Sequence, residues 1–276
     1  MSGAEARTVP ADSLLLDAIL EPGRLSVVFQ PIFQVAGPSR GPLFALECLT
    51  RAPRGTNVER PEVLFKYVRN MRAEAAVDRA CVATALGEAR LLPGQPRLSL
   101  NVHAVTLSRD LGFRAFLLDR ASEAGIEPRR LVVEIVEHAS LPLKPLTLEL
   151  PSFRRALAEL RECGIAIALD DVGLGQSNYK MILDVRPEIY KLDQYLVSGA
   201  WSDPYRQVIL DSLARMVRRL EARAVAEGVE DQHELVAVEA AGIDLVQGYY
   251  FARPVPRSEV VAAGYLSGLV TAAGAP

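Results

Sequence analysis

Apolar residues gather in eight short runs along the chain, and most neighbouring runs are separated by a segment long enough for a helix. Each run is rich in β-branched or alternating apolar residues, which is typical of a strand. The runs cover residues 25–33, 43–51, 97–103, 131–137, 165–171, 188–193, 222–228 and 243–251. Helical spacing of apolar residues occupies most of the intervening chain, at residues 62–92, 108–125, 152–164, 204–222 and 230–242.

Strand alternating with helix, repeated to a count of eight, favours an α/β fold of the (β/α)₈-barrel type over an open sheet. The first two runs are an exception, because only residues 34–42 join them. So short a connection has no room for a crossover helix and suits an antiparallel pair. We therefore predict a modified TIM-like barrel with one antiparallel strand near the N-terminus.

The same pattern predicts how the chain is divided. Residues 1–22 read as a lead-in helix, residues 23–270 as a single barrel domain, and residues 271–276 as a frayed tail. A length of 276 residues is enough for one domain with a large core. We find no internal repeat or linker that would separate two domains.

Composition narrows the class of protein. Hydrophobic residues make up 50% and charged residues 24%, as in ordinary globular domains, and the net charge of -3 gives no reason to expect a DNA or RNA duplex as partner. Cys48, Cys81 and Cys163 follow no CxxC spacing and no secretory signal, which predicts a reduced, cytoplasmic location. No apolar run approaches the roughly 20 residues of a membrane span, so we expect no membrane association.

Polar residues recur late in the predicted strands, where barrels of this type carry their reactive groups. Because residues two apart share a face, Glu47 and Arg51 point one way and Cys48 points the other. We expect these carboxylates and amides to converge on one mouth together with one lysine. The residues are Glu47, Asn101, Glu134, Asp170, Asp171, Lys191, Asp193, Glu227 and Gln247.

Such a cluster predicts divalent cations. Several buried like charges cost several kcal/mol unless cations neutralise them. The ligand atoms are all oxygen, which suits Mg²⁺ or Mn²⁺ better than zinc. The adjacent pair Asp170 and Asp171 can bind two ions about 3.5–4 Å apart, the separation used in two-metal cleavage of phosphoesters.

The chain resembles the EAL-domain family of bacterial phosphodiesterases, which hydrolyse the second messenger cyclic di-GMP to the linear dinucleotide pGpG. Eight motifs in order carry the resemblance. They are "FQPI" at 29–32, "ECLTR" at 47–51, "LNV" at 100–102, "EIVE" at 134–137, "LDDVGLG" at 169–175, "YKLD" at 190–193, "VAEGVE" at 225–230 and "QGYYFARP" at 247–254.

The resemblance implies a role for each matched residue. Glu47, Asn101, Glu134 and Asp170 would hold one metal, and Asp170 would bridge to a second ion bound by Asp171. Glu227 and Gln247 would reach metal-bound waters, and Lys191 would contact the attacking water. Gln30, Arg51 and Asp193 would contact the dinucleotide, and Glu137 would brace the loop after the Asp-Asp pair.

Several positions depart from the family pattern. Cys48 replaces an alanine and Val136 a threonine, and both changes are compatible with added core packing. In the loop after the Asp-Asp pair, Val172 replaces an aromatic residue and Leu174 a hydroxyl residue. Because that loop positions the second metal in the family, these changes affect the expected rate more than the ligands. Gln194 replaces an arginine after the "YKLD" motif.

Three functions follow as alternatives. The first is a phosphodiesterase that requires two Mg²⁺ or Mn²⁺ ions and is inhibited by Ca²⁺, whose looser coordination positions the nucleophile poorly. The second is a catalytically impaired receptor for cyclic di-GMP or a protein-interaction module. The third, remote, is an aldolase that uses Lys191 as a Schiff base. The resemblance also implies a homodimer, and a regulatory protein partner is one route for control.

Overall fold

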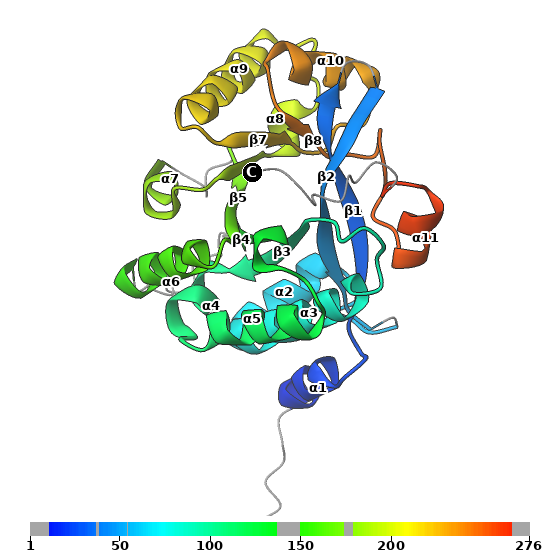
Figure 1. The fold of residues 1–276 in the computed structure, drawn as a ribbon, viewed down its shortest axis with the longest axis vertical. Coiled ribbons are helices and arrows are strands. Elements are labelled where there is room, and N and C mark those ends of the chain that lie inside the picture. The colour runs from blue at the N-terminus through cyan, green and yellow to red at the C-terminus, as the bar shows by residue number, and fades with distance from the viewer. Residues whose placement is uncertain (1–10, 37–38, 54, 137–149, 174–178, 267–276) are drawn as a thin grey trace, which may run out of the picture.

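The computed structural model describes residues 11–36, 39–53, 55–136, 150–173 and 179–266. Within them, eight strands close into a barrel and follow one another around it in chain order, with helices packed outside (Figure 1). The strands are β1 (Ser26–Ala36), β2 (Ser39–Arg51), β3 (Leu98–His103), β4 (Leu131–Val136), β5 (Ala166–Val172), β6 (Ile189–Leu192), β7 (Arg223–Ala226) and β8 (Leu245–Val246).

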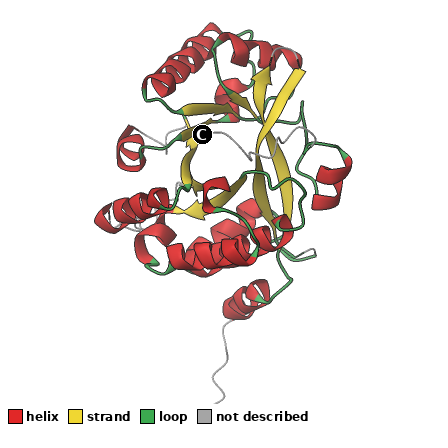
Figure 2. Cartoon of the chain, in the orientation of Figure 1, coloured by secondary structure: helices red, strands yellow, loops and turns green. Residues whose placement is uncertain are grey.

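The helices fill most of the connections between strands, as Figure 2 shows. They are α1 (Ala11–Leu20), α2 (Pro61–Asn70), α3 (Glu74–Ala89), α4 (Ala104–Arg109), α5 (Phe113–Glu123), α6 (Leu150–Glu162), α7 (Tyr179–Val185), α8 (Gln194–Val197), α9 (Pro204–Arg219), α10 (Gln232–Ala240) and α11 (Arg257–Ala262), with a short 3₁₀ turn at Pro128–Arg130. None of the helices within the described ranges combines the length and the apolar character that crossing a membrane would take.

Strand direction confirms the modified barrel. β1 runs antiparallel to both of its neighbours, β2 and β8, whereas every other neighbouring pair is parallel. The C-terminal ends of β2 to β8 therefore meet at one mouth together with the N-terminal end of β1, because Ser26 pairs with Arg51.

Three boundaries differ from the sequence prediction. Residues 34–42 are not a plain loop, because β1 reaches Ala36 and β2 begins at Ser39. The register shifts around Phe33, and such an irregularity accommodates Gly41 and Pro42, which are poor strand residues. The helix predicted over 62–92 is two helices, separated where Arg72 takes a φ of 53°. The eighth run forms a strand only at Leu245–Val246.

The lead-in segment contains α1, whose Ile19 is buried in a cluster with Leu64, Val68 and Val77 from α2 and α3. The predicted frayed tail at residues 271–276 lies outside the described residues. The division into a lead-in helix and one barrel domain stays a prediction.

The barrel interior is packed by one apolar layer. Seven of the eight strands contribute one residue each, and these residues form a separate buried cluster: Ile32, Ala45, Val132, Ala168, Ile189, Val225 and Leu245. A larger cluster lies between the strands and the surrounding helices and contains Cys48, Val82 and Leu100. Cys48 therefore faces the helical shell, as strand parity predicts.

Candidate functional site

A polar layer lies directly above the apolar layer inside the barrel. Each polar residue lies two positions from the apolar layer residue of the same strand. The polar residue comes after the apolar one in β2, β4, β5 and β6 and in the segments that continue β7 and β8. In β1, which runs in the opposite direction, the polar residue comes before the apolar one. This spacing keeps both residues on the inner face of the barrel. The polar residues are Gln30, Glu47, Glu134, Asp170, Lys191, Glu227 and Gln247.

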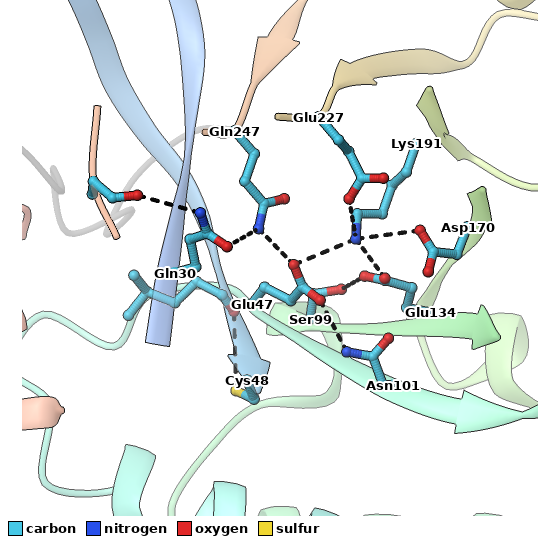
Figure 3. Close-up of polar contacts among 12 residues, drawn as sticks. Gln30, Glu47, Cys48, Ser99, Asn101, Glu134, Asp170, Lys191, Glu227 and Gln247 are labelled. Atoms are coloured by element: carbon cyan, nitrogen blue, oxygen red, sulfur yellow. Dashed lines mark hydrogen bonds and ion pairs between the residues drawn. The ribbon is translucent and has the colours of Figure 1, made fainter. Parts of the chain in front are cut away.

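Lys191 lies at the centre of the polar layer. Its ammonium is 2.5 Å from Glu134 Oε1, 2.7 Å from Glu227 Oε1, 3.4 Å from Glu47 Oε2 and 3.5 Å from Asp170 Oδ1 (Figure 3). The side chains of Lys191 and Glu134 are only 3% and 0% exposed. Four carboxylates, three on β2, β4 and β5 and one directly after β7, thus surround one cation.

The carboxylate of Glu47 is fixed by two amide donors. Asn101 donates to its Oε1 at 3.0 Å, and Gln247 donates to its Oε2 at 2.5 Å. Gln247 also donates to Gln30 Oε1 at 3.1 Å, while Gln30 donates to the carbonyl of Ala252. A chain of hydrogen bonds therefore links β1, β2 and the segment after β8 on one side of Lys191 (Figure 3).

Ser99 also belongs to this site, although the sequence analysis did not single it out. Its hydroxyl donates to Glu134 Oε2 at 2.9 Å, and the residue is 2% exposed. It lies two positions before Asn101 and so shares the inward face of β3. That parity was the available signal, but a serine inside an apolar run carries no charge to mark it.

Asp170 and Asp171 are brought to the same site by an irregularity in β5. Leu169 pairs with Tyr190 and Val172 with Leu192, so β5 has one residue more than β6 between the two pairs. Asp171 takes a φ of 52°, a left-handed conformation that aspartate tolerates better than most residues. In a regular strand the two side chains would point to opposite faces, and the bulge removes that restriction.

Asp170, Asp171 and Glu227 each offer an oxygen within 4.8 Å of the other two, which is close enough for one ion. Among the described residues, no other group of three or more Asp, Glu, His or Cys side chains brings its ligand atoms this close together. Asp171 also shares a hydrogen bond with Asp193, whose carboxylate accepts from the backbone of Tyr195 at the start of α8. Burial, followed by the charges of Asp170 and Asp193, raises the pKa of Asp171 to about 7.

Burial and crowding also raise the pKa of Glu134 and of Glu227, whereas the pKa of Glu47 is lowered. Burial and the neighbouring carboxylates raise the pKa of Glu227 to about 8, although Lys191 opposes the shift. Burial and the charge of Glu47 raise the pKa of Glu134 well above its ordinary value. Burial alone would raise the pKa of Glu47, but Lys191, Asn101 and Gln247 outweigh it and lower that pKa.

Lys191 remains charged in this setting. Burial by itself would lower its pKa, but Asp170, Glu134, Glu227 and Glu47 overcome that effect and raise the pKa of the ammonium well above its ordinary value. A lysine held in this way donates hydrogen bonds and stabilises negative charge. With no divalent ion bound, this direction of the pKa disfavours a role as proton acceptor near neutral pH.

The polar layer fits divalent metal ions. One ammonium faces four carboxylates, so the buried negative charge exceeds the positive charge, and additional cations would offset the excess. The ligand atoms are carboxylate and amide oxygens, the set preferred by Mg²⁺ and Mn²⁺. In addition, Gln247 Oε1 is buried and has no hydrogen-bond partner among the described residues.

Arg51 stands at the rim of the mouth. It lines a cavity of about 260 Å³ together with Glu47, Asn101, Asp170 and Phe65. Its guanidinium donates to the carbonyl of Thr50, and partial burial lowers its pKa. The predicted cation therefore lies beside the carboxylate cluster, next to an open volume.

His103 turns away from the cluster to Asp78 on α3, with its Nδ1 at 2.8 Å from Asp78 Oδ1 and its backbone N–H donating to Asp78 Oδ2. Glu137, predicted to brace the loop, lies outside the described residues, as does Leu174. The structure therefore gives no position for the loop support.

A family model described as the EAL domain matches residues 13–254. The curated protein cyclic di-GMP phosphodiesterase PdeL of Escherichia coli (strain K12) is 28% identical over 171 residues, which cover 62% of this chain and 45% of PdeL. The matched part of this chain thus spans less than half the length of that relative.

Solved structures show the same fold. A standalone versatile EAL protein from Vibrio cholerae O395, solved with cyclic di-GMP bound, is 26% identical with a TM-score of 0.72; the match covers 84% of this chain and 93% of that one. BlrP1 from Klebsiella pneumoniae, solved as a complex of calcium and cyclic di-GMP, is 27% identical with a TM-score of 0.71, covering 85% of this chain and 56% of BlrP1. A manganese complex of BlrP1 matches equally well, with a TM-score of 0.71.

Proposed function

Because this chain belongs to the EAL-domain family, we propose that it hydrolyses cyclic di-GMP to linear pGpG with the help of two divalent ions, Mg²⁺ or Mn²⁺. The observation that carries the proposal is the buried cluster of four carboxylates around Lys191, next to the open cavity beside Arg51. The cyclic di-GMP phosphodiesterase PdeL and the solved complexes with cyclic di-GMP support the choice of substrate.

The proposed ligands of the two ions are the oxygens gathered above the apolar layer. Glu47, Asn101, Glu134 and Asp170 would hold one ion, and Asp170 and Asp171 the other, with Glu227 beside both. When bound, the ions supply an activated water and positive charge against the charge that develops on the phosphate oxygens. The manganese complex of BlrP1 supports this class of metal.

Lys191, Glu47 and Glu227 are the proposed catalytic residues. As an ammonium, Lys191 would orient the water and donate a hydrogen bond to it, while the carboxylates of Glu47 and Glu227 would hold the ions. Glu227 lies 2.7 Å from the lysine, and without a bound ion burial and the neighbouring carboxylates raise its pKa to about 8. Binding of a divalent ion beside it would therefore release its proton.

Substrate contacts are proposed for Gln30, Arg51, Asp193 and Gln247. A guanidinium can hold a phosphate with two parallel hydrogen bonds, and Arg51 faces the cavity that adjoins the carboxylates. Gln30 and Gln247 hydrogen-bond to each other and so present their amides from one side of the mouth. Asp193 starts α8 and would contact the dinucleotide near the second ion.

The test is hydrolysis of cyclic di-GMP by the purified chain in Mg²⁺ and in Mn²⁺, with the products separated by chromatography. Glu47→Ala should abolish formation of pGpG, whereas Glu259→Ala, which removes an exposed carboxylate on α11, should leave the rate unchanged. Calcium should permit binding and suppress turnover. Binding without turnover in Mg²⁺ and Mn²⁺ would instead support an impaired receptor, and equal rates for Glu47→Ala and the wild type would exclude this site.

The proposal extends to the setting of the enzyme. The three cysteines are free thiols, which suits the cytoplasm, where cyclic di-GMP acts as a messenger. We also propose a homodimer, and its measurement is light scattering during gel filtration. A regulatory protein partner remains a proposal for how the activity is controlled.

A further inference from the structure

Ser99 occupies a place in the barrel where every other strand contributes an apolar side chain. The buried inner layer has one apolar residue from β1, β2 and β4 to β8, and β3 alone contributes none to it. Instead, Ser99 lines the same small cavity as the layer residues, at the level where it pairs with Val132 of β4. A hydroxyl in a packed apolar layer requires a hydrogen-bond partner, because an unpaired buried polar group is costly.

The partner of Ser99 is one layer higher. Its hydroxyl donates to Glu134 Oε2 at 2.9 Å, while the ammonium of Lys191 lies 2.5 Å from Oε1 of the same carboxylate. Ser99 is 2% exposed and Glu134 0% exposed, so no solvent competes for either bond. The two donors approach different oxygens, and together they fix the plane of the carboxylate and leave Oε1 turned toward Lys191.

Within the described part of the chain, the cavity below Glu134 offers it no hydrogen-bond donor besides Ser99 and Lys191. The cavity under Lys191 and Glu134 has a volume of about 10 Å³ and is lined by Ser99 and by apolar residues such as Phe44 and Ile189. That volume is at the lower limit for a single water. Without the hydroxyl of Ser99, the lower oxygen of Glu134 would therefore lose its hydrogen bond and find few replacement donors. The hydroxyl of Ser99 is therefore the contact that, together with the ammonium of Lys191, fixes which way Glu134 faces.

We propose that Ser99 is a positioning residue of the site, which orients Glu134 for binding of a divalent ion and for contact with Lys191. This inference rests on the proposed function. Hydrogen-bond partners of metal ligands typically change metal affinity or activity by about 10- to 100-fold when they are removed. Ser99 touches neither the mouth nor the cavity beside Arg51, so its removal should affect ion binding and kcat more than the KM for cyclic di-GMP.

The test compares Ser99→Ala and Ser99→Thr with the wild type, and uses Ser108→Ala, which removes another buried hydroxyl on α4, as the matched control. Calorimetry would measure the Kd for Mn²⁺ without substrate, and steady-state kinetics would give kcat and KM. We expect Ser99→Ala to weaken Mn²⁺ binding about 10-fold or more and to lower kcat by a similar factor, with KM within about two-fold. Ser99→Thr, which keeps the hydroxyl, should recover most of both losses, and Ser108→Ala should match the wild type.

Circular dichroism and thermal melting would establish that each variant is folded. Mn²⁺ affinity and kcat within about two-fold of the wild type in folded Ser99→Ala would overturn the proposal, and so would equal losses in Ser99→Ala and Ser99→Thr. A wild type that binds Mn²⁺ but does not hydrolyse cyclic di-GMP would contradict the proposed function alone, because the binding measurement still decides the role of Ser99. A wild type without Mn²⁺ binding would refute both.

Discussion

The ammonium of Lys191 lies 2.5 Å from Oε1 of Glu134, deep inside the barrel, where both side chains are almost fully enclosed. Three further carboxylates lie within 3.5 Å of the same nitrogen. The ammonium of Lys191 is therefore the positive charge at the centre of four carboxylates that come from different parts of the barrel. Replacing Lys191 by an uncharged residue should show how far hydrolysis and stability depend on this ammonium.

Lys191→Met should abolish hydrolysis and destabilise the protein freed of divalent ions. Removing one partner of a buried ion pair leaves an uncompensated charge and costs about 3–5 kcal/mol. We expect a lower free energy of unfolding in urea with EDTA, and a larger recovery with Mg²⁺ than the wild type shows. Lys180→Met provides the control, because Lys180 is exposed and its ion-pair partner Asp184 on α7 keeps Arg154 as a second partner. Equal stability of the Lys191→Met and Lys180→Met variants would contradict the central role of Lys191.

The raised pKa values predict how stability depends on pH when no divalent ion is bound. The pKa of Asp171 rises from 3.8 to about 7 and that of Glu227 from 4.5 to about 8, so between those limits the folded chain binds more protons than the unfolded chain. The free energy of unfolding must then fall as pH rises through this window. The raised pKa of His103 acts in the same direction, since its stabilisation is lost as pH rises above the folded value.

The measurement is the Tm in EDTA at pH 6.0 and pH 8.5. We expect it to be lower at pH 8.5 by at least about 3 °C, which corresponds to about 1 kcal/mol in a chain of this size. Because only deprotonated carboxylates bind cations, Mg²⁺ should raise the Tm more at pH 8.5 than at pH 6.0. A Tm that rises with pH in EDTA would show that these acids are not crowded in solution.

Asp171→Asn should separate two effects of the Asp171 carboxylate: binding of a divalent ion, and destabilisation of the folded protein when no ion is bound. Asparagine keeps the shape and tolerates the left-handed φ of 52°, but it carries no charge beside Asp170 and Asp193. In EDTA at pH 8 the variant should melt at a higher temperature than the wild type, and the difference should vanish near pH 5.5, where Asp171 is protonated. Mg²⁺ should stabilise the variant less than the wild type.

The control for this experiment is Asp119→Asn, which removes an exposed carboxylate on α5. It should change neither the Tm in EDTA nor the response to Mg²⁺. If Asp171→Asn melts below the wild type at pH 8, the carboxylate stabilises the fold, and the inference that it is disfavoured without a cation is wrong.

The fold and most of the polar layer could be predicted from the sequence, and Glu47 and Glu134 illustrate why. Both are charged residues late in apolar runs, and parity together with the common direction of parallel strands places such residues at one mouth. The antiparallel β1 followed from the short connection to β2. Each of these inferences needs only local spacing and a rule of connectivity.

Ser99 and Asp171 show what local spacing cannot give. The partner of Ser99 is on the neighbouring strand, and nothing within the run at 97–103 indicates that its hydroxyl meets Glu134. Parity also places Asp171 on the face opposite Asp170, and only the bulge in β5 with its left-handed residue changes that. Both features depend on how two strands pair, which a single run does not encode.

Gly248→Ala should disrupt the site through the backbone. A Cβ at Gly248 would lie 2.0 Å from the carbonyl oxygen and 2.3 Å from the nitrogen of Val229, and backbone atoms cannot yield as a flexible side chain does. The same backbone is tied to its neighbours, because Val229 donates to Gln247 and accepts from Tyr250. An added methyl group must therefore push apart the segments that carry Gln247 and Glu227.

We expect Gly248→Ala to lower the free energy of unfolding by about 1–3 kcal/mol and to reduce hydrolysis through displacement of Gln247 from Glu47. Gly87→Ala provides a control in which the free energy of unfolding should change in the opposite direction. Gly87 lies within α3, and the Cβ of an alanine there would have no other atom within 4 Å, so alanine should raise stability by about 0.5–1 kcal/mol. Urea unfolding of both variants decides the point: if Gly248→Ala is as stable as Gly87→Ala, the segments after β7 and β8 are not packed as closely as the contact between Gly248 and Val229 requires.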